Sequence, residues 1–78
     1  MAKLLVSINY HPTQYSARRQ RLIEIIGSEP IDETSQSETD DLLFSIAPEA
    51  ATAVEIKLSR LDFVQRIQAT EEALDNPR

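Results

Sequence analysis

Cysteine is absent from this chain of 78 residues, which excludes disulfide bonds, thiolate metal sites and thiol nucleophiles. A chain of this length forms at most one domain. Its size lies near the lower limit for a core that is stable without disulfides, metals or oligomerisation. Glycine occurs once, as Gly27. Because the tightest hairpins favour glycine, asparagine or aspartate, the composition favours helices and longer connections over a meander or barrel.

The same scarcity excludes several common ligand sites. One glycine cannot supply the GxGxxG or P-loop motifs that bind phosphate. One histidine, His11, and no cysteine leave only carboxylates as metal ligands, and no calcium-loop pattern is present. The chain has no signal-peptide pattern and no apolar run of the length that a membrane span requires. We therefore expect a cytoplasmic protein with no cofactor, no metal and no membrane contact.

Basic and acidic residues are unevenly distributed along the chain. The formal net charge is −5, from 13 acidic and 8 basic residues. This balance argues against general affinity for nucleic acid, because such binding depends on neutralising phosphates. Residues 22–56 contain no lysine or arginine. Upstream of them, three arginines form a compact basic island: Arg18, Arg19 and Arg21.

The first half of the chain predicts a strand followed by a helix. Apolar residues alternate over residues 3–10, which is typical of a strand with one buried face. Pro12 ends this strand, since proline cannot donate a hydrogen bond to a ladder. A helix is predicted over residues 13–26, with Gly27 at the position of a C-cap.

Residues 28–41 have the composition of a mobile, solvated loop. Their length exceeds that of most connections, which is typical of a disordered or functional segment. The alternative is an acidic docking segment for a basic partner. The segment contains one proline, five serines and threonines, and six acids: Glu29, Asp32, Glu33, Glu38, Asp40 and Asp41.

An internal echo relates two apolar segments. Residues 4–8 read LLVSI, residues 42–46 read LLFSI, and a proline follows each of them. A second strand is therefore predicted over residues 41–47. Its apolar character on both faces is typical of a strand inside a sheet. The echo favours two successive strand–proline–helix units.

The segment after the second strand is open to two interpretations. Pro48 followed by Glu49 is a strong helix start, and no glycine or proline interrupts the chain from there to residue 76. A single helix over residues 48–75 is the favoured interpretation. The alternation of residues 53–58 instead favours a strand in a hairpin, followed by a helix capped at Ser59.

These elements predict an α+β fold: a small β-α-β-α single domain covering residues 1–78, with a long C-terminal helix. A β-α-β-β-α order, a ferredoxin-like fragment, is the alternative. In the favoured order, the two strands would be parallel and joined by a right-handed crossover. A two-stranded sheet and a helix of about 40 Å leave apolar surface uncovered. We therefore expect a homodimer or a protein partner.

The functional prediction is a small acidic, non-enzymatic protein-binding or regulatory protein. Its sharpest form is an inhibitor or neutraliser of a protein that handles nucleic acid. One alternative is RNA binding through the arginine island, and another is a small enzyme using His11, because strand ends often carry catalytic residues. The predicted partner-binding residues are the arginines, four loop acids and three apolar positions of the long helix: Arg18, Arg19, Arg21, Asp32, Glu33, Asp40, Asp41, Phe63, Ile67 and Leu74.

Overall fold

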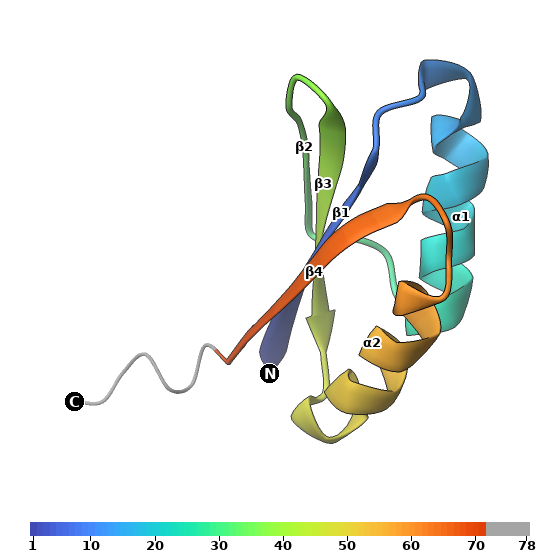
Figure 1. The fold of residues 1–78 in the computed structure, drawn as a ribbon. Coiled ribbons are helices and arrows are strands. Elements are labelled where there is room, and N and C mark those ends of the chain that lie inside the picture. Colours follow the sequence, from blue (N-terminus) through green and yellow to red (C-terminus); the bar gives the residue numbers. More distant parts are fainter. Residues whose placement is uncertain (72–78) are drawn as a thin grey trace.

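The computed structural model describes residues 1–71 of the chain as one small α+β domain (Figure 1). Four strands and two helices follow one another in β-α-β-β-α-β order: β1 (Ala2–Asn9), α1 (Tyr15–Ile26), β2 (Asp32–Ser35), β3 (Thr39–Ile46), α2 (Ala51–Ser59) and β4 (Val64–Glu71). A short 3-10 turn precedes each helix, at Pro12–Gln14 and at Pro48–Ala50. The predicted α+β class and small single domain are confirmed, but the predicted β-α-β-α order is wrong because two further strands are present.

The strands form one antiparallel sheet in the order β2-β3-β1-β4. Both helices lie on the same side of this sheet, and the other side carries no helix (Figure 1). Each helix connects two strands that have a third strand between them, which is the split β-α-β arrangement of ferredoxin-like folds.

The predicted long helix over residues 48–75 is wrong from residue 60 to residue 71, and its last four residues lie outside the described part of the chain. The helical segment does begin at Pro48, but α2 ends at Ser59. After a short turn the chain extends as β4, which pairs with β1 along an edge that would otherwise be unpaired. Tertiary pairing thus outweighs the helical spacing of apolar residues. The hairpin alternative is also wrong, because residues 53–58 are helical.

The predicted parallel crossover is wrong because of a strand that carries no apolar signal. β2 lies within the predicted loop of residues 28–41 and consists of four exposed residues, DETS. Its presence reverses the chain once more before β3, so that β1 and β3 run antiparallel. Four strands also remove the shortage of sheet on which the expectation of a homodimer depended. The mobility of the acidic segment stays a prediction.

The echo has a structural meaning in the pairing of the two central strands. Leu5 corresponds to Leu43 in the echo, and these two residues are also direct partners in the ladder between β1 and β3. The neighbouring ladder pairs are Val6–Leu42 and Leu4–Phe44. The echo maps one pair onto the other, because Leu4 corresponds to Leu42 and Val6 corresponds to Phe44. A local two-fold axis therefore passes between Leu5 and Leu43, perpendicular to the sheet.

Alternate residues of the strands build two different faces. The face beneath the helices forms the core, to which α1 contributes Leu22 and α2 contributes Val54 and Leu58. The strand residues of this core are Ala2, Leu4, Val6, Ile8, Leu42, Phe44 and Ile46. On the open face the strand register places mostly polar residues: Lys3, Leu5, Ser7, Asn9, Asp32, Thr34, Thr39, Asp41, Leu43, Ser45, Arg66 and Gln68.

Helix α1 ends as the sequence predicts. Gly27 adopts a left-handed conformation with φ of 94°, and its N–H donates to the carbonyl oxygen of Ile23 at 2.7 Å. Glycine adopts this conformation without the steric cost that other residues bear. The helix therefore stops where the chain must turn toward β2.

Candidate functional site

A pocket of about 290 Å³ lies at one end of the sheet, between the β2–β3 hairpin and the start of α1. Its walls come from β2, β3, the end of β1 and the first turn of the helix. The lining residues are two tyrosines, two carboxylates, two hydroxyl residues and a proline: Tyr10, Tyr15, Glu33, Asp40, Thr34, Ser35 and Pro12. The pocket thus combines aromatic rings with acidic groups.

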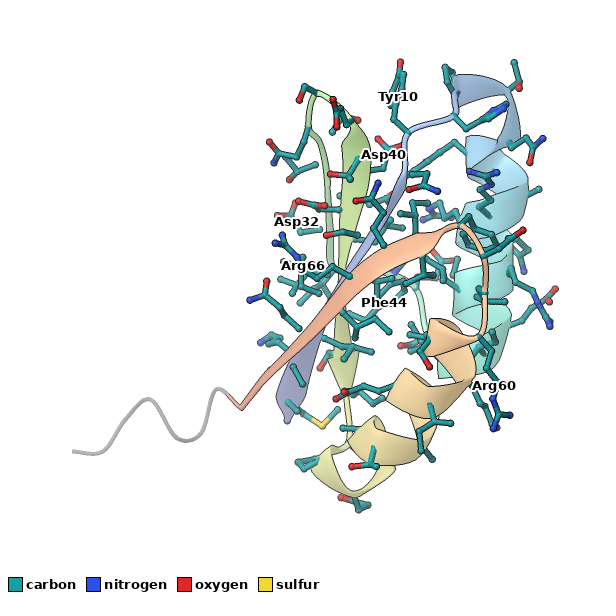
Figure 2. The ribbon with its side chains drawn as sticks, viewed as in Figure 1. Tyr10, Asp32, Asp40, Phe44, Arg60 and Arg66 are labelled. Atoms are coloured by element: carbon teal, nitrogen blue, oxygen red, sulfur yellow. The ribbon has the colours of Figure 1, made fainter. Side chains whose placement is uncertain are left out.

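Backbone pairing holds the acidic wall of this pocket in place. Ser35 and Asp40 are partners in the β2–β3 ladder, and the Ser35 hydroxyl donates to Asp40 Oδ1 at 2.7 Å. The Tyr10 N–H donates to the carbonyl oxygen of Glu38 at 3.0 Å, which attaches the end of β1 to the hairpin turn. Asp40 is only 5 % exposed, whereas the Tyr10 side chain projects into solvent at 51 %. Figure 2 shows both residues near this end of the molecule.

Glu33 is held by two donors from α1. Its Oε1 accepts a hydrogen bond from the Tyr15 hydroxyl and another from Arg19 Nε at 3.0 Å. These hydrogen bonds, first that of Tyr15 and then that of Arg19, lower the pKa of Glu33 below its usual value because they stabilise the carboxylate. Arg19 also contacts Glu29 at 3.6 Å. One arginine is therefore shared between two carboxylates.

The field in the pocket is negative. Burial raises the pKa of Tyr15, and the hydrogen bond to Glu33 and the charges of Glu33 and Asp40 raise it further. The charge of Arg19 opposes these effects but does not reverse them. The charges of Glu33 and Asp40 disfavour a tyrosinate for the same reason that they would favour a cation, whereas burial disfavours a charged group of either sign. The arrangement therefore suits an ammonium or guanidinium group, for which carboxylates and tyrosine faces are both good partners.

The structure separates the four predicted acids into two pairs. Glu33 and Asp40 lie on the helix side of the hairpin and line the pocket. Asp32 and Asp41 point to the open face of the sheet, because each neighbours a pocket residue along its strand. Sequence reasoning chose these residues for their charge, and alternation along the strands then assigns them to different surfaces.

The arginine island does not form one surface. Arg18 lies 5.1 Å above the ring of Phe63 and donates to the carbonyl oxygen of Asn9 at 3.4 Å. Arg19 is occupied by the acids of the hairpin, as described above. Arg21 is exposed and contacts Glu24 on its own helix at 3.7 Å. Two of the three arginines thus attach α1 to the rest of the domain.

The remaining predicted residues are not part of the pocket. Phe63 and Ile67 are partly buried against the core, and Leu74 lies outside the described residues. His11 is exposed and does not line the pocket; its Nδ1 lies 3.1 Å from the Thr13 hydroxyl. Within residues 1–71, no group of three or more histidine, aspartate or glutamate side chains is placed to hold a metal ion.

Five of the seven residues that line the pocket were not predicted from the sequence, and the two tyrosines are the most important of them. Tyr10 follows the end of β1, and Tyr15 begins α1 seven residues before the buried Leu22. Helical spacing assigns Tyr15 to the core-facing side of the helix, and the structure packs Tyr15 against the core while its hydroxyl donates to Glu33. The available signal was that a buried tyrosine hydroxyl needs a polar partner.

A larger groove of about 460 Å³ runs between α2 and the outer edge of β4. The exposed side chain of Ile56 lies on one wall, and Ile67 lies on the other. Its only charged residues are Glu55 and Arg66, which have opposite signs. Since no set of like charges or of buried polar groups converges there, the smaller pocket is the better candidate site.

Comparisons with protein-family models, curated proteins and solved structures found no match to this chain. Neither helix of the described part is long and apolar enough to cross a membrane. The geometry of the pocket and the charges around it are therefore the observations that bear on function.

Proposed function

We propose that this chain is a small, non-enzymatic binding protein that docks on a basic segment of a protein partner. The pocket formed by Tyr10, Tyr15, Glu33 and Asp40 would receive one arginine or lysine side chain of that segment. The observation that carries the proposal is the combination of two carboxylates with two tyrosines in one pocket.

The burial of Asp40 supports a cationic guest. One of its oxygens accepts a hydrogen bond from Ser35, and no basic side chain in the described part of the chain pairs with it. A carboxylate that is 95 % buried gains most from a charged partner that also makes hydrogen bonds. A guanidinium or ammonium group in the pocket would supply both.

The surrounding acids favour a polypeptide over a small cation. Glu29, Asp32 and Glu38 lie on or beside the same hairpin and extend the negative region beyond the pocket. Such a field accelerates the encounter with a basic surface and aligns it, and its effect falls as salt rises. A regulator that covers the basic surface of a nucleic-acid-handling protein is the form of this function that the charge supports best.

The two alternative functions receive less support. RNA binding through the arginine island would need all three of its arginines free, but Arg18 and Arg19 are engaged inside the domain and Arg21 is the one member of the island left at the surface. An enzyme built on His11 would need an activated nucleophile or a carboxylate beside it, and the group within hydrogen-bonding distance of its ring is the hydroxyl of the neighbouring Thr13.

The test is a titration of the full chain against a fluorescent nona-arginine peptide, followed by anisotropy at low and high salt. We expect binding that weakens with salt and that weakens at least about tenfold in Asp40→Asn, because the buried charge is lost. Glu49→Gln is the matched control, since it removes the same charge at the far end of the sheet, where α2 begins. Equal affinity of the two variants would contradict the proposal, as would the absence of binding at low salt.

A further inference from the structure

The open face of the sheet divides into an acidic half and a basic half. Asp32 and Asp41 lie on β2 and β3, whereas Arg66 lies on β4 beyond the other central strand. No ion pair within residues 1–71 involves any of these three side chains. Figure 2 shows Asp32 and Arg66 on the side of the sheet that points away from the helices. The face therefore carries opposite charges that the described domain does not neutralise.

The centre of the same face is partly apolar and contains an unsatisfied hydroxyl. Leu5 and Leu43 are direct ladder partners, and both are half-buried. Ser7 follows on β1, opposite Asp41, and is only 2 % exposed. Its Oγ has no hydrogen-bond partner. The apolar surface at the centre of the face therefore comes from Leu5 and Leu43, because the Ser7 hydroxyl is covered by the domain itself.

We infer that this face binds the same face of a second copy of the chain. A two-fold axis parallel to the strands, placed above Leu5 and Leu43, brings two copies together face to face. This rotation lays β2 of one copy over β4 of the other, and β3 over β1. The acidic half of each copy then covers the basic half of its partner.

Two contacts follow from this arrangement. The leucine pair of one copy packs on the leucine pair of the other, and both pairs are thereby removed from contact with water. Asp32 and Asp41 lie within reach of Arg66 of the second copy, on both sides of the axis. A two-fold axis perpendicular to the strands would instead place acid on acid, so the charges select one orientation.

The size of the face predicts a weak dimer. Three strands of eight residues and one of four, spaced about 4.8 Å apart with about 3.3 Å per residue, cover roughly 440 Å² per copy. Interfaces of this size are at the small end of specific protein–protein contacts. We expect a dissociation constant between about 10 μM and 1 mM, which makes the dimer dependent on protein concentration. This contact is separate from the pocket, so either proposal can fail without the other.

Sedimentation equilibrium of the full chain over this concentration range tests the inference. The average mass should rise from that of one chain toward that of two. Arg66→Glu should weaken the dimer at least about tenfold, because it places like charges in contact. Arg60→Glu makes the same charge change on the helix side, where Figure 2 shows Arg60, and should leave the mass curve unchanged. A chain that stays monomeric at 1 mM, or an equal effect of both substitutions, would overturn the inference.

Mixing two variants separates a true interface from damage to the fold. The double variant Asp32→Lys, Asp41→Lys should also remain monomeric by itself, because its face is entirely basic. Mixed with Arg66→Glu, it should form a heterodimer within about threefold of the original affinity, since every charge contact becomes attractive again. Failure of the folded variants to associate on mixing would overturn the proposed orientation. Concentration-dependent NMR shifts that map to the groove between α2 and β4 would assign self-association to that surface instead.

Discussion

The two faces of the sheet are made by the same strands, yet they differ in almost every physical property. On the helix side, Leu4 and Phe44 are fully buried in a continuous apolar core. One residue away on the other side, Leu5 and Leu43 are half-buried among charged and hydroxyl side chains. The comparison shows that stability is concentrated on one face, which leaves the other face and the hairpin end free to carry charge.

The energetic contrast follows from burial. A fully buried leucine or phenylalanine contributes about 1.5–3 kcal/mol by removal from water, and its loss also leaves a cavity. A half-buried leucine on a wet face contributes a fraction of this amount. For a domain of this size the total free energy of unfolding is about 4–12 kcal/mol. A few side chains on the helix face therefore determine whether the chain folds.

The largest expected effect comes from a matched pair of neighbouring leucines. Leu4→Ala should lower the free energy of unfolding by about 2–5 kcal/mol, and Leu5→Ala by about 1 kcal/mol or less. The two variants differ only in which face loses the side chain. Urea denaturation at a concentration where the chain is monomeric measures both values. Similar losses in the two variants would show that the open face is packed like a core.

A smaller effect is expected at the margin of the covered face, where α1 is attached to the sheet. Arg18→Ala should cost about 1–2 kcal/mol, because it removes the contact with the Phe63 ring and the hydrogen bond to Asn9. Arg21→Ala is the control from the same arginine island, and it should cost less than about 0.5 kcal/mol. Thermal denaturation of the two variants orders them. A larger loss of stability in Arg21→Ala than in Arg18→Ala would mean that the exposed arginine contributes more to the fold than Arg18 does.

The smallest effect is expected at Glu33, and it depends on pH. The pKa of Glu33 lies below its ordinary value of 4.5 in the folded chain, so the carboxylate stabilises the fold above that pH. This stabilisation is lost as the pH falls through the lowered pKa. Glu33→Gln should cost about 0.5–1 kcal/mol at neutral pH, with allowance for partial exposure, and progressively less as the pH falls below 4.5 toward the lowered pKa. Melting temperatures between pH 7 and pH 3, with Glu24→Gln as control, measure the difference. A constant difference across this range would contradict the linkage.

The covered face was largely predictable from the sequence, and the rest was not, for physical reasons. Alternating apolar residues predict β1, a nearly continuous apolar run predicts β3, and Pro12 and Gly27 mark the limits of the first helical segment. β2 was not predicted, because its four residues are exposed and owe their strand conformation to backbone pairing with β3 alone. The pairing of β4 with β1 shifts its register between Ser7 and Ile8 of β1, and this shift disrupts the alternation along β4. Val64 and Ile67 therefore match helical spacing as well as a strand.

The candidate site shows the same limit. Charge alone pointed to Glu33 and Asp40, and the structure places both of them in one pocket. The contact of Glu33 with Tyr15 and Arg19 joins residues 14 to 18 positions apart, across a connection that the sequence does not orient. Because β2 was not predicted, the predicted direction of β3 relative to β1 was also reversed. A short polar strand therefore had more influence on the predicted topology than its four residues suggest.

The position of β1 at the centre of the sheet has a consequence for how the chain acquires its structure. During synthesis, β1 emerges before both of its partners, yet it pairs with β3, about forty positions later, and with β4, more than fifty positions later. Its apolar face and both of its hydrogen-bonding edges must stay unpaired until those segments exist. Long-range pairing of this kind slows folding relative to a helical bundle. The interval between the synthesis of β1 and that of β4 is when the nascent chain is most exposed to aggregation.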